Sequence, residues 1–125
     1  MTIMQINAES QALLEKVMAR FNRFSACPWE VQMDPYQVVP NVYYVGNKYV
    51  ESYLLNTDKG LVLIDVAMQS MVYLLFESIR KLGFDPADIK TVLISHGHGD
   101  HCGAARRVQE YSGLHQFLSL CKLLQ

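Results

Sequence analysis

The chain has few of the features that mark several large classes of protein. Its three cysteines in 125 residues are too few and too scattered for a disulfide framework. Its 11 basic and 12 acidic side chains leave a net charge of −1, which argues against electrostatic binding to nucleic acid or to an anionic membrane. No apolar run approaches the roughly 18 residues that span a bilayer. The first nine residues lack the basic segment of a signal peptide. We therefore expect a cytoplasmic protein with no nucleic-acid or membrane partner.

The residues present suit one small α/β domain. Half of them (50%) are hydrophobic, which is enough for a core in a chain of this length. Apolar residues at helical spacing predict helices over 7–24, 69–82 and 102–111. Runs of apolar and β-branched residues predict strands over 36–46, 49–57, 60–66 and 90–95. The stretch 61–64 is apolar at every position, which predicts a strand in the interior of the sheet. After Gly113 the spacing becomes leucine-rich and roughly helical.

A cluster of metal-ligating side chains lies where a predicted strand ends and a predicted helix begins. Three of the four histidines in the chain fall within six positions, with an aspartate among them: His96, His98, Asp100 and His101. Binding groups on such loops are held by the rigid elements on both sides. The cluster therefore predicts a binding site. The alternative, a histidine-rich surface loop without metal, is less consistent with so many ligand types after an apolar strand.

The spacing within the cluster indicates how a metal could be bound. In an extended segment the rings of His96 and His98 point the same way, so they can share one metal ion. Asp100 and His101 follow a turn and can face a second ion. Imidazole with carboxylate suits zinc, with iron or manganese as weaker options. Paired metal ions typically lie about 3.5–4 Å apart and hold a bridging water as a nucleophile. We therefore predict a zinc site at these four residues.

The motif His96-x-His98-x-Asp100-His101 resembles the metal signature of the metallo-β-lactamase superfamily. Upstream, the segments 41–46, 52–57 and 60–65 resemble the opening strands of that fold, and 82–90 resembles its approach to the metal-bearing strand. The resemblance extends over residues 36–113. Redox di-iron members of the superfamily usually have Glu at the second position of the motif. His98 therefore favours a hydrolytic zinc site.

The resemblance implies an α/β fold, specifically the first half of an αββα sandwich in which a mixed sheet has flanking helices. It divides the chain into an N-terminal helix and connection (1–35), the half domain (36–113) and a divergent tail (114–125). A later His, a bridging Asp and a final His of the family would lie downstream, so the chain resembles a truncated member. Such a half sandwich would expose one apolar sheet face, where we expect self-association.

The resemblance also implies the role of each site residue. Two zinc ions would hold a bridging hydroxide that attacks a carbonyl or phosphoryl centre of a small-molecule substrate. His96 and His98 would bind the first ion, and Asp100 and His101 the second, with Asp100 also orienting the nucleophile as the catalytic residue. Asp65 would brace the metal loop from outside the ligand set. β-Lactams, lactones, thioesters and phosphodiesters all remain open as substrates.

Two departures from the family pattern concern backbone packing near this site. The family usually continues after the Asp65 position with Thr-Gly or Gly-Gly, whereas this chain has Val66-Ala67. That change puts the close backbone approach at this turn in question. The family also usually has Gly-Gly where this chain has Gly103-Ala104, and we expect that change to be tolerated.

Other functions and site residues remain open. The chain is alternatively an inactive truncated relic, or a metal-binding module completed by a second chain. Trp29 either rims the site or packs as an ordinary aromatic residue. Cys102 either touches the metal or fills the start of a helix, and His115 is either a further ligand or a surface histidine. For these three residues the structural role is the more common one.

Overall fold

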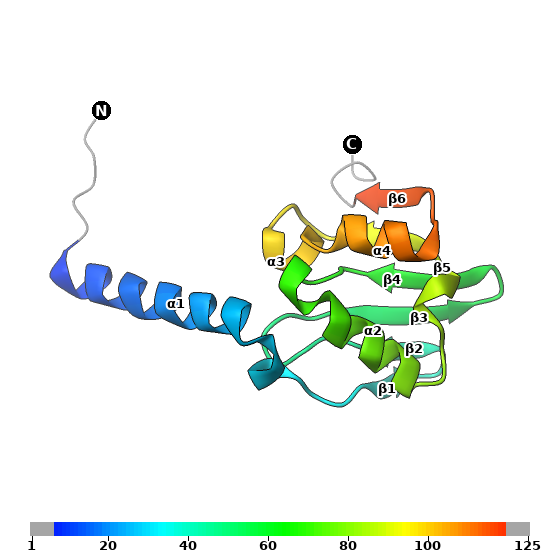
Figure 1. Cartoon of the computed structure of the whole chain (residues 1–125), viewed down its shortest axis with the longest axis horizontal. Coiled ribbons are helices and arrows are strands. Elements are labelled where there is room, and N and C mark those ends of the chain that lie inside the picture. Colours follow the sequence, from blue (N-terminus) through cyan, green and yellow to red (C-terminus); the bar gives the residue numbers. More distant parts are fainter. Residues whose placement is uncertain (1–6, 120–125) are drawn as a thin grey trace.

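The structure is a computed structural model that describes residues 7–119. Six strands form one mixed sheet in the order β1-β2-β3-β4-β5-β6, which is also their order in the sequence (Figure 1). The first four strands pair antiparallel, whereas β4, β5 and β6 are parallel. The strands are β1 (Tyr36–Val39), β2 (Val42–Tyr44), β3 (Tyr53–Thr57), β4 (Gly60–Ile64), β5 (Ile89–Ile94) and β6 (Gln116–Ser119). The predicted α/β class and the interior position of β4 are confirmed.

Four α-helices and three 3-10 turns connect and flank the strands. The α-helices are α1 (Ala8–Ala26), α2 (Val72–Lys81), α3 (Gly99–Cys102) and α4 (Ala105–Ser112). The 3-10 turns are η1 (Pro28–Val31), η2 (Gln69–Met71) and η3 (Pro86–Asp88). Within the described range 7–119, no helix is both long and apolar enough to cross a membrane.

The main core lies between the sheet and two of the helices. Ile79 of α2 and Val108 of α4 pack in one cluster with Leu54, Leu63 and Val92 of the sheet, and all five are fully buried. Successive side chains of a strand point to opposite faces. In β4, accordingly, buried and half-buried residues alternate along the strand. The two helices therefore cover one face of the sheet, and the other face keeps part of its apolar surface accessible.

Helix α1 projects away from the sheet (Figure 1). Asn7 caps its first turn, where the side-chain oxygen accepts a hydrogen bond of 2.8 Å from the Ser10 amide. Among residues 7–119, only the other end of the helix packs against the domain. There, Phe21 and Phe24 pack against a small buried cluster that includes Met71. The helix predicted over 7–24 is confirmed.

Three of the predicted strands are shorter than expected. The single strand predicted over 36–46 is wrong, because Asn41 has a φ of 64° and turns the chain between β1 and β2. Asn tolerates this left-handed conformation better than most residues, and the preceding Pro40 has no N–H to donate. The side chain of Asn47 accepts hydrogen bonds from the amides of Tyr49 and Val50, both 2.7 Å, and holds that segment as a loop before β3. β4 ends at Ile64 rather than at residue 66.

The C-terminal part of the described chain also differs from the prediction. The single helix predicted over 102–111 is replaced by α3 and α4, and the helical character expected after Gly113 is wrong for Gln116–Ser119. That segment is β6, where Phe117 lies opposite Val92 of β5. Apolar spacing over so few residues does not separate strand from helix, so pairing with an open sheet edge decides. Residues 120–125 of the predicted tail lie outside the described range. The division of the chain at residues 35 and 113 stays a prediction.

Candidate metal centre

The site is built at the edge of the sheet where β4 and β5 end. Because these strands are parallel neighbours, the residues that follow them meet at the same edge. Asp65 follows β4 directly, and its amide donates a 2.9 Å hydrogen bond to the carbonyl of Leu93 in β5. His96 lies two residues beyond β5. Asp65 and His96, which are 31 positions apart in the sequence, are thereby brought together.

All four predicted ligands and the predicted bracing residue lie close to one another. Two sets of three side chains each bring their ligand atoms within 4.8 Å of one another. Asp65, His96 and His101 form one set, and His96, His98 and Asp100 form the other. The His96 ring centroid lies 4.7 Å from that of His98 and 4.1 Å from that of His101. His98 is exposed, and the other three motif residues are half-buried. The cluster is therefore accessible from solvent while most of it is held by the fold.

Asp65 is the buried centre of a hydrogen-bond network. Its side chain is only 8% exposed. Oδ1 accepts a 2.8 Å bond from the Ser95 amide, and Oδ2 accepts bonds from Ser95 Oγ (2.6 Å) and His101 Nδ1 (2.8 Å). Because a carboxylate only accepts, Nδ1 of His101 carries the proton and Nε2 keeps its lone pair. Asp65 thus fixes which nitrogen His101 offers to a metal ion, which matches the bracing position predicted for it.

Ser95 belongs to the same network, and the sequence reasoning missed it. Its single hydroxyl proton goes to Asp65, so its oxygen accepts from His96 Nδ1 at 2.8 Å. His96 therefore also has its Nε2 free. Hydrogen bonds of this kind orient the histidines that bind metals. The available signal was a hydroxyl residue placed between an apolar strand and the first histidine.

At Val66-Ala67 the backbone does approach the metal loop closely, although the departure from the family pattern put this approach in question. The amide of Val66 donates to the carbonyl of His101 at 2.9 Å, and the amide of Ala104 donates to the carbonyl of Ala67 at 3.0 Å. Ala67 adopts a φ of 65°, a conformation that usually favours glycine, and is 3% exposed. The turn keeps its hydrogen bonds to the metal loop at the cost of a strained alanine.

The second departure, Gly103-Ala104, is accommodated without strain. A Cβ on Gly103 would lie 2.4 Å from the carbonyl oxygen of Gly99 and 3.3 Å from the amide nitrogen of Gln69. Ala104 is fully buried in the main core and has room for its methyl group. The first glycine of the family pair is thus required here and the second is not.

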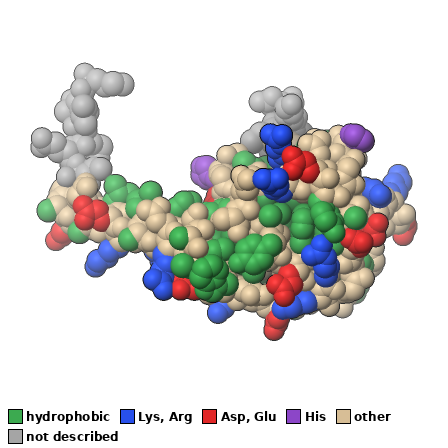
Figure 2. All heavy atoms as spheres, in the orientation of Figure 1, with side chains coloured by type: hydrophobic (Ala, Val, Ile, Leu, Met, Phe, Trp, Pro, Cys, Tyr) green, Lys and Arg blue, Asp and Glu red, His purple; other side chains and the backbone are tan. Residues whose placement is uncertain are grey.

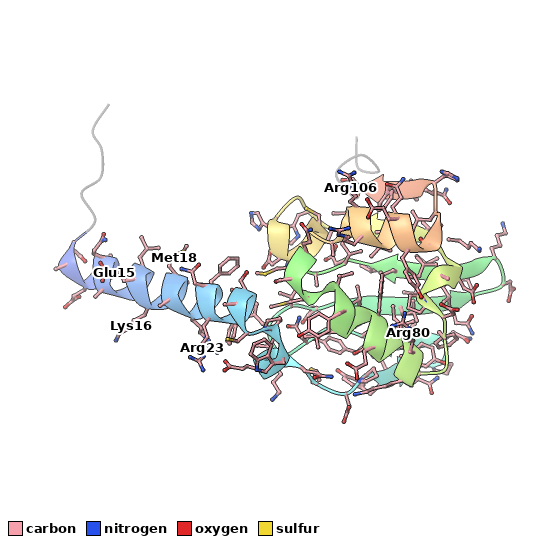
Figure 3. The ribbon with its side chains drawn as sticks, in the orientation of Figure 1. Glu15, Lys16, Met18, Arg23, Arg80 and Arg106 are labelled. Carbon is pink, nitrogen blue, oxygen red and sulfur yellow. The ribbon has the colours of Figure 1, made fainter. Side chains whose placement is uncertain are left out.

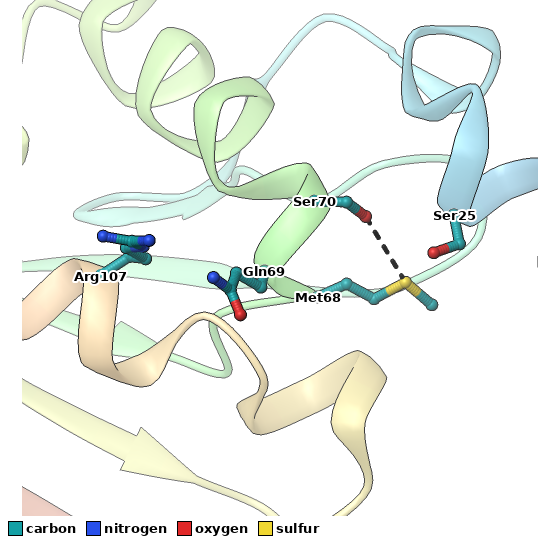
Figure 4. A pocket seen from close by; sticks show the side chains of 5 residues that line it. All are labelled: Ser25, Met68, Gln69, Ser70 and Arg107. Carbon is teal, nitrogen blue, oxygen red and sulfur yellow. Dashed lines mark hydrogen bonds between the residues drawn. The ribbon is translucent and has the colours of Figure 1, made fainter.

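The remaining candidates lie outside the cluster. Trp29 is 59% exposed on η1, so the ordinary packed role expected for this aromatic residue is not observed. Within residues 7–119, neither Cys102 nor His115 belongs to a group of converging metal-ligating atoms. A hollow of about 590 Å³ lies instead between the end of α1, η2 and α4 (Figure 4). Its lining residues are Ser25, Met68, Gln69, Ser70 and Arg107. None of these belongs to the groups of converging ligand atoms, so the hollow and the cluster are separate features.

Comparison with known proteins identifies the family. The model of the metallo-beta-lactamase superfamily matches residues 45–119, more than half of the chain. The chain belongs to the metallo-β-lactamase superfamily. The match continues beyond Gly113, where the resemblance in the sequence ended, through β6.

Solved metallo-β-lactamases are similar in both sequence and structure. BJP-1, a subclass B3 enzyme of Bradyrhizobium japonicum, is 35% identical with a TM-score of 0.68, and the match covers 74% of this chain and 35% of that one. FEZ-1 from Legionella gormanii (34%, TM-score 0.66) matches over 69% of this chain and 33% of its own. GOB-18 from Elizabethkingia meningoseptica (34%, TM-score 0.67) matches over 70% and 33%. This chain therefore spans about a third of the length of these metallo-β-lactamases.

The donor set suits a zinc ion. His96 shares one group of ligand atoms with His98 and Asp100 and another with Asp65 and His101, and zinc accepts both imidazole and carboxylate ligands. Two of the three rings have Nδ1 engaged by Asp65 or Ser95, so their ligand atom is selected before any metal arrives. Asp65 itself already accepts three hydrogen bonds, which favours a bracing role over direct coordination.

Proposed function

We propose that this chain contributes the metal-binding half of a zinc-dependent hydrolase that acts on a carbonyl or phosphoryl centre. The observation that supports this most strongly is the convergence of His96, His98, Asp100 and His101 at the edge where β4 and β5 end. In this proposal His96 and His98 hold one zinc ion, Asp100 and His101 hold a second, and Asp65 braces the loop. The sites would be accessible to a small-molecule substrate.

The chain's own residues orient the reactants. When bound, zinc lowers the pKa of a water molecule and polarises the substrate. Asp100, with its side chain 25% exposed, is the group that accepts a hydrogen bond from the attacking water and fixes its direction. Asp65 and Ser95 keep the rings of His101 and His96 from rotating. Because the solved relatives are named metallo-β-lactamases, a β-lactam is the first substrate to test, followed by lactones, thioesters and phosphodiesters.

The number of ligands favours a second candidate alongside the first. Zinc usually takes four ligands, so two ions on four side chains would depend on water or on groups from elsewhere. The relatives are about three times as long as the stretch they share with this chain. The chain could thus act as a metal-binding module that a second chain completes, or be an inactive relic of a longer hydrolase.

Zinc content separates a working metal site from a remnant. We expect about two zinc ions per purified chain, measured by elemental mass spectrometry, and a loss of most of them in a His96→Ala/His98→Ala double variant. His115→Ala is the matched control, because His115 is exposed and lies outside the cluster. A native chain that holds no zinc would contradict the proposal.

Turnover then separates the enzyme from the module. Hydrolysis of a chromogenic β-lactam that is abolished by Asp100→Ala would support a hydrolase. Zinc binding without turnover in the monomer, with activity or tighter binding appearing on association, would favour the module completed by a second chain. Zinc binding without turnover under any of these conditions would favour the relic.

A further inference from the structure

Most of helix α1 has no partner in the described part of the chain. Every residue from Asn7 to Arg20 is exposed, and the helix has no buried residue at all. The exposed positions include large apolar side chains: Leu13 at 63%, Val17 at 53% and Met18 at 48%. Figure 2 shows hydrophobic side chains along this projecting helix. Such a stretch of apolar surface on a helix normally marks a buried face.

The free segment also receives little support from the described part of the chain. Isolated helices of fewer than about 12–15 residues are marginal in water, because nucleation is costly and few hydrogen bonds follow. The first turns of α1 gain only the Asn7 cap and a 3.4 Å hydrogen bond between Gln11 and Glu15. Packing of the apolar side would therefore supply most of the stability of this segment.

The arrangement of charge around the helix indicates what kind of surface would cover it. At 3.6 residues per turn, Leu13, Val17 and Leu14 lie within an arc of about 100°. Glu9, Lys16 and Arg20 lie together on one flank of that arc, within about 40° of one another. Figure 3 shows Met18 on one side of the helix and Lys16 on the other. The acidic residue of the charged flank is near the start of α1, and the basic residues follow it.

We propose that α1 pairs with α1 of a second copy of this chain in an antiparallel arrangement centred near Leu14. Antiparallel helices related by a two-fold axis bring the same flank of each helix together in opposite order. Glu9 then faces the partner's Arg20, and Arg20 faces the partner's Glu9. A parallel pair would instead set this flank against the opposite one, which contains Gln11 and Asn22 and offers no charge pairs.

The proposed interface is independent of the metal centre and of the proposed function. Its apolar seam consists of Leu13, Leu14 and Val17 with Met18 beside it, and all four are exposed in the single chain. The two symmetric Glu9–Arg20 pairs are solvent-accessible, so they set the orientation more than the strength of the pairing. The apolar seam supplies most of the strength.

Charge reversal tests the antiparallel orientation. In sedimentation equilibrium of the full chain, we expect a dimer that Glu9→Arg or Arg20→Glu each weakens by about tenfold, since both symmetric pairs change from attraction to repulsion. Mixing the two variants should restore the native affinity, because each reversed residue then meets an opposite charge. Glu15→Arg is the matched control. It makes the same charge change on the side away from the seam and should leave the dimer intact.

A second variant tests the seam itself. Val17→Gln should abolish the dimer and lower the α-helical signal in circular dichroism, although Gln has a helix propensity at least as high as Val. A chain that stays monomeric at all concentrations would overturn the proposal. So would a dimer that tolerates Val17→Gln, which would point to the open sheet face, or a mixture of the charge variants that fails to restore binding.

Discussion

At the scale of single residues, the hydroxyl of Ser95 holds the first histidine of the metal motif in place. It joins the Asp65 carboxylate to His96 Nδ1 through bonds of 2.6 and 2.8 Å. We predict that Ser95→Ala weakens zinc binding by about 10- to 100-fold, because the His96 ring is then free to rotate and to change tautomer. A competition titration against a chromophoric chelator measures the change.

Two further serine variants make that result specific. Ser95→Thr keeps the hydroxyl and should keep most of the affinity. Ser70→Ala removes the same atoms at a position where Oγ has only a 4.0 Å contact with Met68 Sδ, so zinc binding should not change (Figure 4). A Ser95→Ala chain that binds zinc as tightly as the native chain would show that other contacts hold the ring of His96 in place.

The left-handed conformation of Ala67 gives a prediction for stability. A non-glycine residue in this region costs roughly 1–2 kcal/mol, part of which a glycine recovers. Ala67→Gly should therefore raise the free energy of unfolding by up to about 1 kcal/mol, measured by urea denaturation. Ala105→Gly, at the first residue of α4, removes a methyl group that packs against the main core and should have the opposite sign. A destabilised Ala67→Gly chain would mean that the methyl group packs better than its backbone conformation suggests.

At the scale of elements, one ion pair joins the end of α1 to η1. Arg23 Nε and Nη2 donate to the two carboxylate oxygens of Glu30 at 2.8 and 2.7 Å. These hydrogen bonds lower the pKa of Glu30 below its ordinary value of 4.5. A lowered pKa in the folded state means that the stabilising effect is complete above the ordinary pKa and is lost as the pH falls through the lowered one.

The lowered pKa of Glu30 predicts how the last turn of α1 responds to acid. The amide of Cys27 donates to the carbonyl of Arg23 at 2.7 Å, so its hydrogen-exchange protection reports on that turn. We expect Glu30→Gln to lower this protection at about pH 7, and the difference from the native chain to disappear only as the pH falls through the lowered pKa of Glu30. High salt should shrink the difference as well, since both side chains are accessible. A difference that does not depend on pH would exclude the ion pair as its cause.

The helices and strands also show what the sequence could and could not predict. Helices α1 and α2 and the β3–β4 hairpin follow from periodicity and turn residues, which are local properties. The strand boundaries depend on Asn41 and Asn47, whose side chains and φ values end or delay a strand, and periodicity does not show these effects. Strand β6 forms by pairing with β5, a non-local interaction that the leucine-rich stretch after Gly113 does not reveal.

The candidate site was predictable to a similar extent. The four motif residues lie close together in the sequence, so their convergence needs only one loop and the short helix α3, which contains Asp100 and His101. The position of Asp65 depends on parallel pairing between β4 and β5, and only the family resemblance indicated it. The bond from Ser95 to His96 is between neighbours in the chain, yet it depends on rotamers that the buried Asp65 sets.

At the scale of the whole molecule, zinc would join two parts of the fold that are distant in sequence. The ligands follow β5, and the residue that braces them follows β4. Because zinc would bind only the folded arrangement, it should raise the free energy of unfolding by about 2.7 kcal/mol when its concentration is 100 times Kd. We predict a melting temperature that rises with added zinc, and no such rise in the His96→Ala/His98→Ala variant. A native chain that melts at the same temperature with and without zinc would contradict this.

The order of the strands has a consequence for how such a chain can be made. Each strand pairs only with strands that are its neighbours in the sequence, from β1 through β6. During synthesis on a ribosome, each new strand can therefore be added to the edge left by the previous one without waiting for a later segment to be inserted between them. The six described strands therefore form a sheet whose interior needs no segment from beyond β6.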